Sequence, residues 1–257
     1  MMSFFVISFK NAFVYRASVI FSIIGSVFTM LISIALWTFV YKHDATKISY
    51  MIAYVILSGI ISLFYSGGMS DTIAGKVTSG AFAIDLIRPI NYISMHYFQL
   101  LGGMCSSLIM RGIPVIVAFM PLLIVNASFN SFINIIYALV AILLGHILYI
   151  IIYSLIGFMA FSFLEILPFN RLMNDTIRFL SGSFIPLALF PGWLGRIASI
   201  LPFQFMYSFP IQLIIGDESM ESITQNFVIL LLWSVILGIL LLLTYKKAIN
   251  KCTVQGG

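Results

Sequence analysis

Three histidines are the residues of this sequence that could bind a metal ion or transfer a proton. His43, His96 and His146 lie in different segments, and none has a second metal ligand at helical spacing. A zinc site needs two or more such ligands close together. The histidines therefore do not predict a metal centre, and we expect the chain to bind no metal or cofactor itself.

Two serines in an apolar segment are candidates for nucleophilic chemistry. Ser106 or Ser107 could form a hydrolase dyad with His146, but no Gly-x-Ser-x-Gly context surrounds either serine. A motif without its context is weak, and serines often pack between membrane helices as small residues. We favour the packing interpretation.

A phosphate-binding loop is also missing from the sequence. Gly75-Lys76 is followed by Val77, and Ser70 stands where the pattern requires its first glycine. The cradle of backbone N–H groups that holds nucleotide phosphates is therefore not predicted. We expect that this chain does not hydrolyse ATP on its own.

Arg111 and His146 are the ionisable residues in the middle of apolar segments that contain no Asp or Glu. Both lie about 21 Å from the outer ends of their expected spans, at 1.5 Å per residue. They could meet across a hairpin and line a polar path, as in an ion-coupled carrier. The alternative, which we favour, is that Arg111 extends to the inner headgroups and His146 bonds a neighbouring helix.

The composition excludes most soluble proteins. Of 257 residues, 61% are hydrophobic and 8% are charged, and the mean hydropathy is +1.12. Soluble domains carry roughly 25% charged residues. Two cysteines make no disulfide framework, and the scattered basic residues do not indicate nucleic-acid binding. An integral protein of the lipid bilayer remains.

Apolar segments predict an all-α protein with one transmembrane domain, because a helical span needs about 20 apolar residues. An interfacial helix is expected over residues 1–16, before the first span. Residues 186–210 contain four prolines, which exclude one straight span, so we expect short external helices at about 191–213. The six expected spans are 17–41, 50–66, 97–125, 132–162, 172–190 and 223–244.

The distribution of Lys and Arg predicts the orientation. Nine of the 13 lie on one side of the expected spans, three lie on the other, and Arg111 lies within the membrane. Cytoplasmic loops carry the excess of positive charge. Both termini and the segment 69–94 are therefore expected in the cytoplasm, and the proline-rich segment outside.

The segment 69–94 predicts short helices of its own. Ser70 suits a helix N-cap, Asp71 the first turn and Gly80 the position after the end, which predicts a helix over 71–79. A second turn over 81–87 should stop before Arg88, because the residue before Pro89 is disfavoured in a helix. We interpret the segment as a docking surface for a soluble partner; the alternative is a solvated connector.

With these features, the sequence resembles the membrane subunits of type-2 ATP-binding cassette (ABC) exporters, in a six-span branch of about this size. The likeness covers nearly the whole chain. Its motifs are Lys76-Val-Thr-Ser-Gly80 with Leu86-Ile-Arg-Pro89, Tyr50-Met-Ile-Ala-Tyr54, and Leu180-Ser-Gly-Ser-Phe-Ile-Pro-Leu187 with Phe190-Pro191 and Leu201-Pro-Phe203.

The resemblance implies that residues 71–79 form a coupling helix seated in a groove of a separate ATPase. Asp71 and Lys76 would be its charged contacts, within a segment that also holds Ser79 and Gly80, and Arg88-Pro89 would orient the return into span three. The N-terminal helix would be the elbow at the inner leaflet. The external cap would include Pro186, Pro191, Trp193, Pro202 and Phe203.

The resemblance also implies a multi-pass subunit of a bacterial cytoplasmic membrane. It would pair with a second, identical or related permease above two ATPases that bind ATP and Mg²⁺. Few charges lie in the spans, so we expect an amphiphilic or bulky apolar cargo. Two alternatives stay open: a membrane scaffold or assembly factor that recruits a cytoplasmic partner, and a secondary carrier that uses Arg111 and His146.

Overall fold

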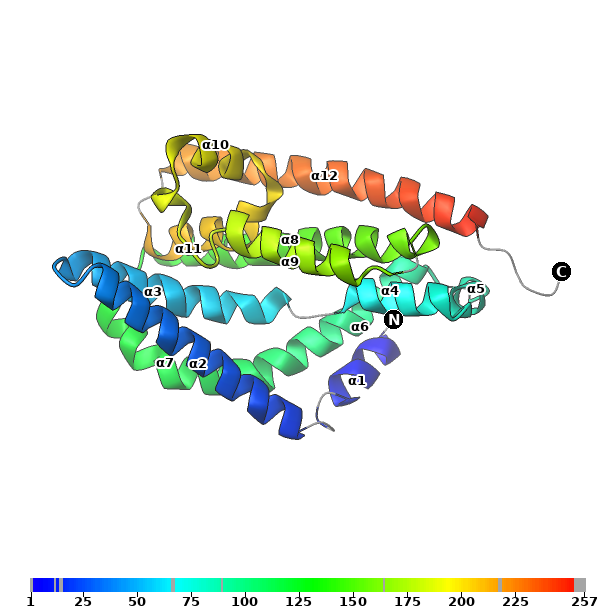
Figure 1. Cartoon of the computed structure of the whole chain (residues 1–257), viewed down its shortest axis with the longest axis horizontal. Coiled ribbons are helices and arrows are strands. Elements are labelled where there is room, and N and C mark those ends of the chain that lie inside the picture. The colour runs from blue at the N-terminus through cyan, green and yellow to red at the C-terminus, as the bar shows by residue number, and fades with distance from the viewer. Residues whose placement is uncertain are drawn as a thin grey trace.

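A computed structural model describes residues 2–11, 13, 16–65, 68–88, 90–163, 165–216 and 219–251. Within these residues every regular element is a helix (Figure 1), so the all-α prediction is confirmed. The longer elements are α1 (Met2–Asn11), α2 (Arg16–Val40), α3 (Ala45–Ser62), α4 (Met69–Thr78), α5 (Ala81–Leu86), α6 (Tyr92–Ser107), α7 (Ile113–Asn126), α8 (Phe132–Phe158), α9 (Leu167–Leu180), α10 (Gly192–Ile200), α11 (Ser208–Ile215) and α12 (Met220–Lys251). Short turns η1 (Leu63–Tyr65), η2 (Leu108–Gly112), η3 (Met159–Phe161), η4 (Leu187–Leu189) and η5 (Pro202–Met206) connect them.

Five ranges, all of described residues except at 66 and 67, have the length and hydropathy of a membrane span: Ala17–Val40, Ala45–Thr78, Tyr92–Asn126, Phe132–Phe161 and Met220–Asn250. The second range combines α3 and η1 with α4, and residues 66 and 67 between them lie outside the described residues. They contain or closely match five of the six expected spans. The second begins at Ala45, earlier than predicted, because the Asp44 side chain caps α3 by accepting the Lys47 N–H at 3.1 Å. The chain is a multi-pass integral membrane protein.

The expected fifth span differs from the structure. A helix over 172–190 was predicted, but α9 ends at Leu180 after 14 residues, which rise only about 21 Å. Gly182 then turns the chain with φ at 81°, a value that favours glycine. A hydrocarbon core is about 30 Å thick, so α9 is too short to cross it alone, and the count of six spans stays a prediction.

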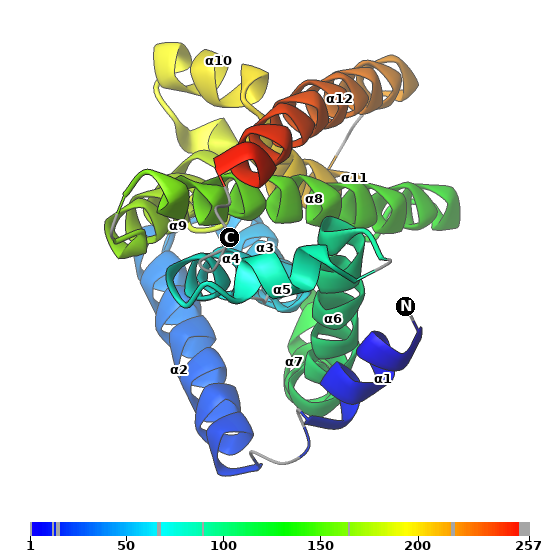
Figure 2. The ribbon, with the colours of Figure 1, turned by 90° about the vertical axis from the view of Figure 1, so that its right-hand side faces the viewer.

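Helix α8 lies at the centre of the packing, against α4, α11 and α12 (Figure 2). Two glycines allow this close approach. A Cβ at Gly145 would lie 2.7 Å from the Tyr65 hydroxyl, and one at Gly157 would lie 2.8 Å from the Ile73 Cβ. Small residues let membrane helices approach closely, and here they let α8 contact both η1 and α4.

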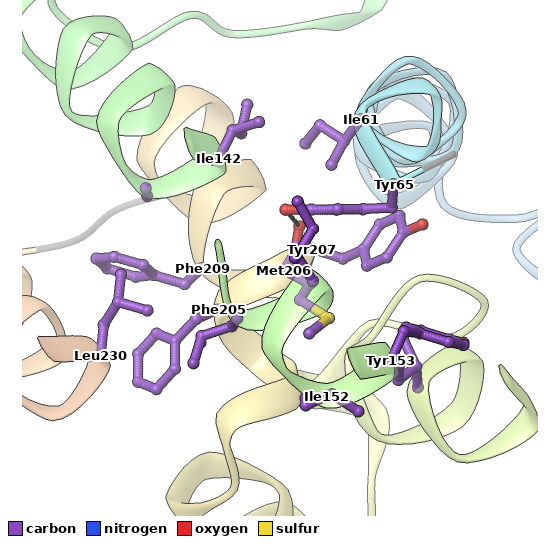
Figure 3. Packing of buried hydrophobic residues seen from close by; sticks show 14 of the residues in the cluster. Ile61, Tyr65, Ile142, Ile152, Tyr153, Phe205, Met206, Tyr207, Phe209 and Leu230 are labelled. Carbon is purple, nitrogen blue, oxygen red and sulfur yellow. Dashed lines mark hydrogen bonds between the residues drawn. The ribbon is translucent and has the colours of Figure 1, made fainter. Parts of the chain in front are cut away.

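Aromatic side chains fill the core beside α8 (Figure 3). Tyr65 of η1 points at η5, where its hydroxyl donates a hydrogen bond of 2.7 Å to the Met206 carbonyl. Phe205 and Phe209 meet edge to face with ring centroids 5.8 Å apart. The ring contact holds η5 and α11 together, and the Tyr65 bond attaches the segment between α9 and α12 to the rest of the bundle.

The two ends of the bundle are built differently (Figure 1). One end holds the hairpin of α4 and α5 and the C-terminal part of α12, and there α1 packs on α6, where a side chain at Gly102 would overlap the Phe5 carbonyl oxygen. At the other end lie α10 and α11. The predicted N-terminal helix and short helices after residue 190 are therefore present. We call the end with α4 and α5 the hairpin end, and the end with α10 and α11 the cap end.

Candidate functional site

The α4–α5 hairpin occupies the segment in which the sequence predicted a helix over 71–79 and a second turn over 81–87. Helix α4 spans Met69–Thr78 and α5 spans Ala81–Leu86. Gly80 joins them with φ at 74°, in the left-handed region that favours glycine. The two short helices and the glycine turn are close to the prediction, but the predicted N-cap is wrong. Helix α4 begins at Met69, so Ser70 is buried inside the helix, and Gly68 at the N-cap has no side chain to bond the first turn.

A buried carboxylate connects the two arms of the hairpin. Asp85 is 3% exposed and accepts a hydrogen bond from the Lys76 ammonium group. The Arg88 Nε atom lies 3.4 Å from the other carboxylate oxygen, and His96 Nε2 of α6 lies 4.0 Å from Asp85. We call Lys76, Asp85, Arg88 and His96 the hairpin cluster. The single carboxylate faces two partly exposed cations, and Lys76 is therefore an ion-pair partner of Asp85 within the chain.

Asp71 is exposed, yet it too is bonded to another part of the chain. Its carboxylate accepts a hydrogen bond of 2.8 Å from the Asn170 side-chain amide, and Asn170 is a buried residue of α9. The hairpin is therefore bonded to α9 by a polar contact between residues 99 positions apart. Sequence reasoning did not find this pairing, because no local pattern links the two residues.

The outward surface of the hairpin carries two exposed isoleucines among polar residues and glycines. Ile84 and Ile87 are 63% and 81% exposed, and Ser79 and Gly80 at the turn are also exposed. About half of the Arg88 side chain is exposed. Pro89 lies outside the described residues. Sequence reasoning missed the two isoleucines, although their spacing of three residues around a helical turn could have indicated them.

A groove opens between α2, α3 and α9, with a volume of about 480 Å³. One wall carries hydroxyl groups and the other carries Asp175 and Arg178 of α9. Apolar side chains complete it, so the groove has both polar and apolar surface. Its lining residues are Thr29, Met30, Ser33, Val55, Ser58, Gly59, Ser62, Asp175, Arg178, Phe179, Ser183, Phe184 and Tyr207.

Hydrogen bonds hold the groove in shape. The Tyr54 hydroxyl donates to the Gly182 carbonyl and the Ser58 hydroxyl to the Ser183 carbonyl, each at 2.8 Å. Both bonds attach the turn after α9 to α3. Sequence reasoning did not predict the groove, although hydroxyl residues four apart on α2 and α3, such as Thr29 and Ser33, share a helix face.

The structure does not bring Arg111 and His146 together. Arg111 donates hydrogen bonds to the hydroxyls of Ser22, at 3.0 Å, and Ser107. His146 is 2% exposed, and its Nδ1 atom lies 2.7 Å from the Phe64 carbonyl oxygen. Neither residue lines the groove. The hydroxyl of Ser106 donates to Gly103, and no hydrogen bond in the described part of the chain joins His146 to either candidate serine.

The predicted cap residues lie at the ends of short elements. Pro186 precedes η4, Pro191 precedes α10 and Pro202 begins η5. Trp193 is 67% exposed, and Phe203 packs on the edge of the core. In the described ranges no three His, Cys, Asp or Glu side chains gather where they could hold a metal ion.

Comparison with known proteins adds one match. The family model described as "ABC-2 family transporter protein" matches residues 45–256, from the start of α3 almost to the C-terminus. No curated protein matches the chain. The matched range contains the hairpin, α9 and most of the groove-lining residues.

Proposed function

The chain belongs to the ABC-2 family of transporter proteins, and from this we propose that it is the permease subunit of an ATP-driven exporter. A separate ATPase would bind ATP and Mg²⁺ and dock on the hairpin end. The single observation that carries the proposal is the continuous connection from the hairpin, through the bond between Asp71 and Asn170, to α9 and the groove.

The exposed surface of the hairpin suits a protein partner. Ile84 and Ile87 offer apolar area next to the turn at Gly80. Burying an isoleucine side chain stabilises an interface by roughly 1.5–3 kcal/mol. Because Lys76 is already paired with Asp85, docking depends on these isoleucines and the exposed part of Arg88.

Coupling then follows from rigid contacts. The hairpin cluster joins α4, α5 and the start of α6 into one unit. When the ATPase closes and displaces this unit, the bond from Asp71 pulls on Asn170 at the beginning of α9. Movement of α9 changes the groove, because Asp175 and Arg178 lie farther along the same helix. The free energy of ATP binding to the ATPase would thereby shift the equilibrium between two conformations of the groove.

A second permease would complete the pathway. Charged and hydroxyl groups within a bilayer face a protein interior or water rather than lipid. The groove of one chain is open beside α2, which exposes apolar residues such as Phe21 and Phe28. A second, identical or related chain over this face would enclose the polar wall and leave room for an amphiphilic cargo.

The test is crosslinking in a complex co-expressed with an ABC ATPase. A cysteine at Ile84 should crosslink to the ATPase, and a cysteine at Trp193, also exposed but at the cap end, should not. In reconstituted vesicles, cargo should move only with ATP. Crosslinking without ATP-driven movement would favour the scaffold alternative, and movement driven by an ion gradient alone would contradict the proposal.

A further inference from the structure

Arg111 is a cation in a membrane span, and the described residues give it no ionic partner. No Asp or Glu of the described residues forms a salt bridge with it; its two hydrogen bonds go to the neutral hydroxyls of Ser22 and Ser107. Ionisable side chains are costly in this environment and are retained for a function. A counter-ion from outside the chain would explain the residue.

A cavity of about 260 Å³ lies directly at this guanidinium group. Ser18 and Ser22 of α2 line one side, and Ser106 and Ser107 of α6 line the other, with Arg111 between them. One water needs only about 10–15 Å³ of such free space, so a tetrahedral oxyanion fits. The cavity lining contains no carboxylate.

The hydrogen bonds favour an anion. Arg111 donates to the oxygens of Ser22 and Ser107, so each hydroxyl proton is left to be donated elsewhere. The guanidinium has five N–H donors, and those not used on the serines can also face the cavity. The site is therefore rich in hydrogen-bond donors. The planar guanidinium group of Arg111 matches the geometry of phosphate oxygens.

Two measures place the cavity near the headgroups at the hairpin end. Ser22 lies five residues after Ala17, where its span begins, which is about 7–8 Å along the helix. Arg111 lies about 22 Å from Asn126, where its span ends on the side away from the hairpin. In a hydrocarbon core about 30 Å thick, about 8 Å then remain between Arg111 and the core surface at the hairpin end. Both positions lie about 8 Å inside the hydrocarbon core, a depth from which a long arginine side chain can reach toward the headgroups. The π-helical turn η2, a type of turn frequent at functional sites, carries Arg111 there.

We propose that Arg111, Ser22 and Ser107 bind a phosphate group in this cavity. Its depth makes the phosphodiester of a lipid headgroup the expected source, in the leaflet at the hairpin end. A soluble phosphate would offer the same oxygens. The site is separate from the groove between α2, α3 and α9, because the two cavities share no lining residue.

The test measures lipid binding to the purified full chain by native mass spectrometry, with no ATPase present. The probes are phosphatidylglycerol, diacylglycerol, which has no phosphate, and inorganic phosphate as a soluble competitor. We expect phosphatidylglycerol to bind and diacylglycerol not to bind. Arg111→Gln should weaken phosphatidylglycerol binding about tenfold or more, because hydrogen bonds to charged groups are the stronger ones. The matched control is Lys246→Gln, which removes an exposed cation of α12 at the same end and should change nothing.

Binding of inorganic phosphate that depends on Arg111, without binding of phosphatidylglycerol, would support the site with a soluble source. Equal binding of diacylglycerol and phosphatidylglycerol would overturn the proposal, as would equal phosphatidylglycerol binding by wild type and Arg111→Gln. If Arg111→Gln does not fold, Ser22→Ala keeps the charge and should weaken binding about threefold through one lost hydrogen bond; no change would overturn the proposal. Because no ATPase is present, a negative result here leaves the proposed export function untouched.

Discussion

The hairpin cluster and the groove between α2, α3 and α9 are both polar, yet they use their polar groups in opposite ways. In the cluster, Asp85 is buried and satisfied by Lys76 and Arg88. In the groove, Asp175 and Arg178 line an open cavity. A network bonded to itself makes a rigid unit, whereas side chains facing a cavity are available to a ligand. Under the proposed function, this difference suits the hairpin to transmit force and the groove to contact a cargo.

The largest effect is expected when the closed network is broken. Asp85→Asn leaves Lys76 and Arg88 without their carboxylate. The loss should be about 2–3 kcal/mol of unfolding free energy, less than the roughly 3–5 kcal/mol of a fully buried pair, because both cations are partly exposed and screened. Thermal unfolding of the detergent-purified chain measures it. Asp44→Asn at the cap end is the control, since asparagine also caps helices; equal stability of the two variants would contradict a closed cluster.

The second effect tests whether the outward face of the hairpin is the docking surface. The double variant Ile84→Ser/Ile87→Ser removes apolar area that is exposed in the free chain. We expect the affinity for the ATPase to fall about tenfold or more, at roughly 1.4 kcal/mol per factor of ten, with unchanged thermal stability. Ile249→Ser, an exposed isoleucine near the end of α12, is the matched control. Undiminished ATPase binding by the double variant would place docking elsewhere.

A third variant removes the hydrogen bond that connects the hairpin to α9 and the groove. Asn170→Ala removes the hydrogen bond to Asp71, which should cost about 1 kcal/mol of stability. Cargo transport per ATP hydrolysed should fall several-fold, while ATP hydrolysis and ATPase binding continue. Vesicles loaded with cargo measure both rates. Phe169→Leu, on the same helix but without this bond, serves as the control; a normal transport-to-hydrolysis ratio in Asn170→Ala would show that coupling takes another route.

The smallest effect is expected at Asp44, far from both regions. Hydrogen bonds from the Thr46 hydroxyl and the Lys47 N–H lower the pKa of Asp44 to about 2. Because the folded pKa is lowered, the stabilising cap is fully present above pH 4 and is lost as the pH falls toward 2. Asp44→Ala should therefore lower the unfolding temperature slightly at pH 7, with less difference from wild type at pH 2. A difference that grows toward acid would contradict this assignment.

Much of the fold follows from local sequence. The apolar runs predicted the long helices to within a few residues, since length and hydropathy decide which segments can cross a bilayer. Gly80 and the prolines after residue 185 predicted the hairpin turn and the broken cap segment, because backbone geometry is a local property. The exception is α9, which ends at Leu180, although the sequence after it stays apolar.

The contacts of the candidate site residues were predicted less well from the sequence. The partner contacts of Lys76 and Asp71 stay a prediction, and the sequence did not indicate that both side chains are also bonded within the chain. Arg111 and His146 were considered as one polar path, but they bond to different helices. Composition and spacing place a charge on a segment without showing which distant residue will meet it.

The sequence by itself determined that this chain is an all-helical membrane protein with a short helical hairpin between two apolar segments. Hydropathy, capping residues and glycine are properties of neighbouring residues, and they act before any distant contact forms. The tertiary structure alone decided that Asp85 is satisfied internally, that Asp71 bonds to α9 and that Arg111 faces a cavity lined with serines. These outcomes depend on the packing of helices far apart in the chain, because a charge in a low-dielectric interior takes whichever partner the fold brings within reach.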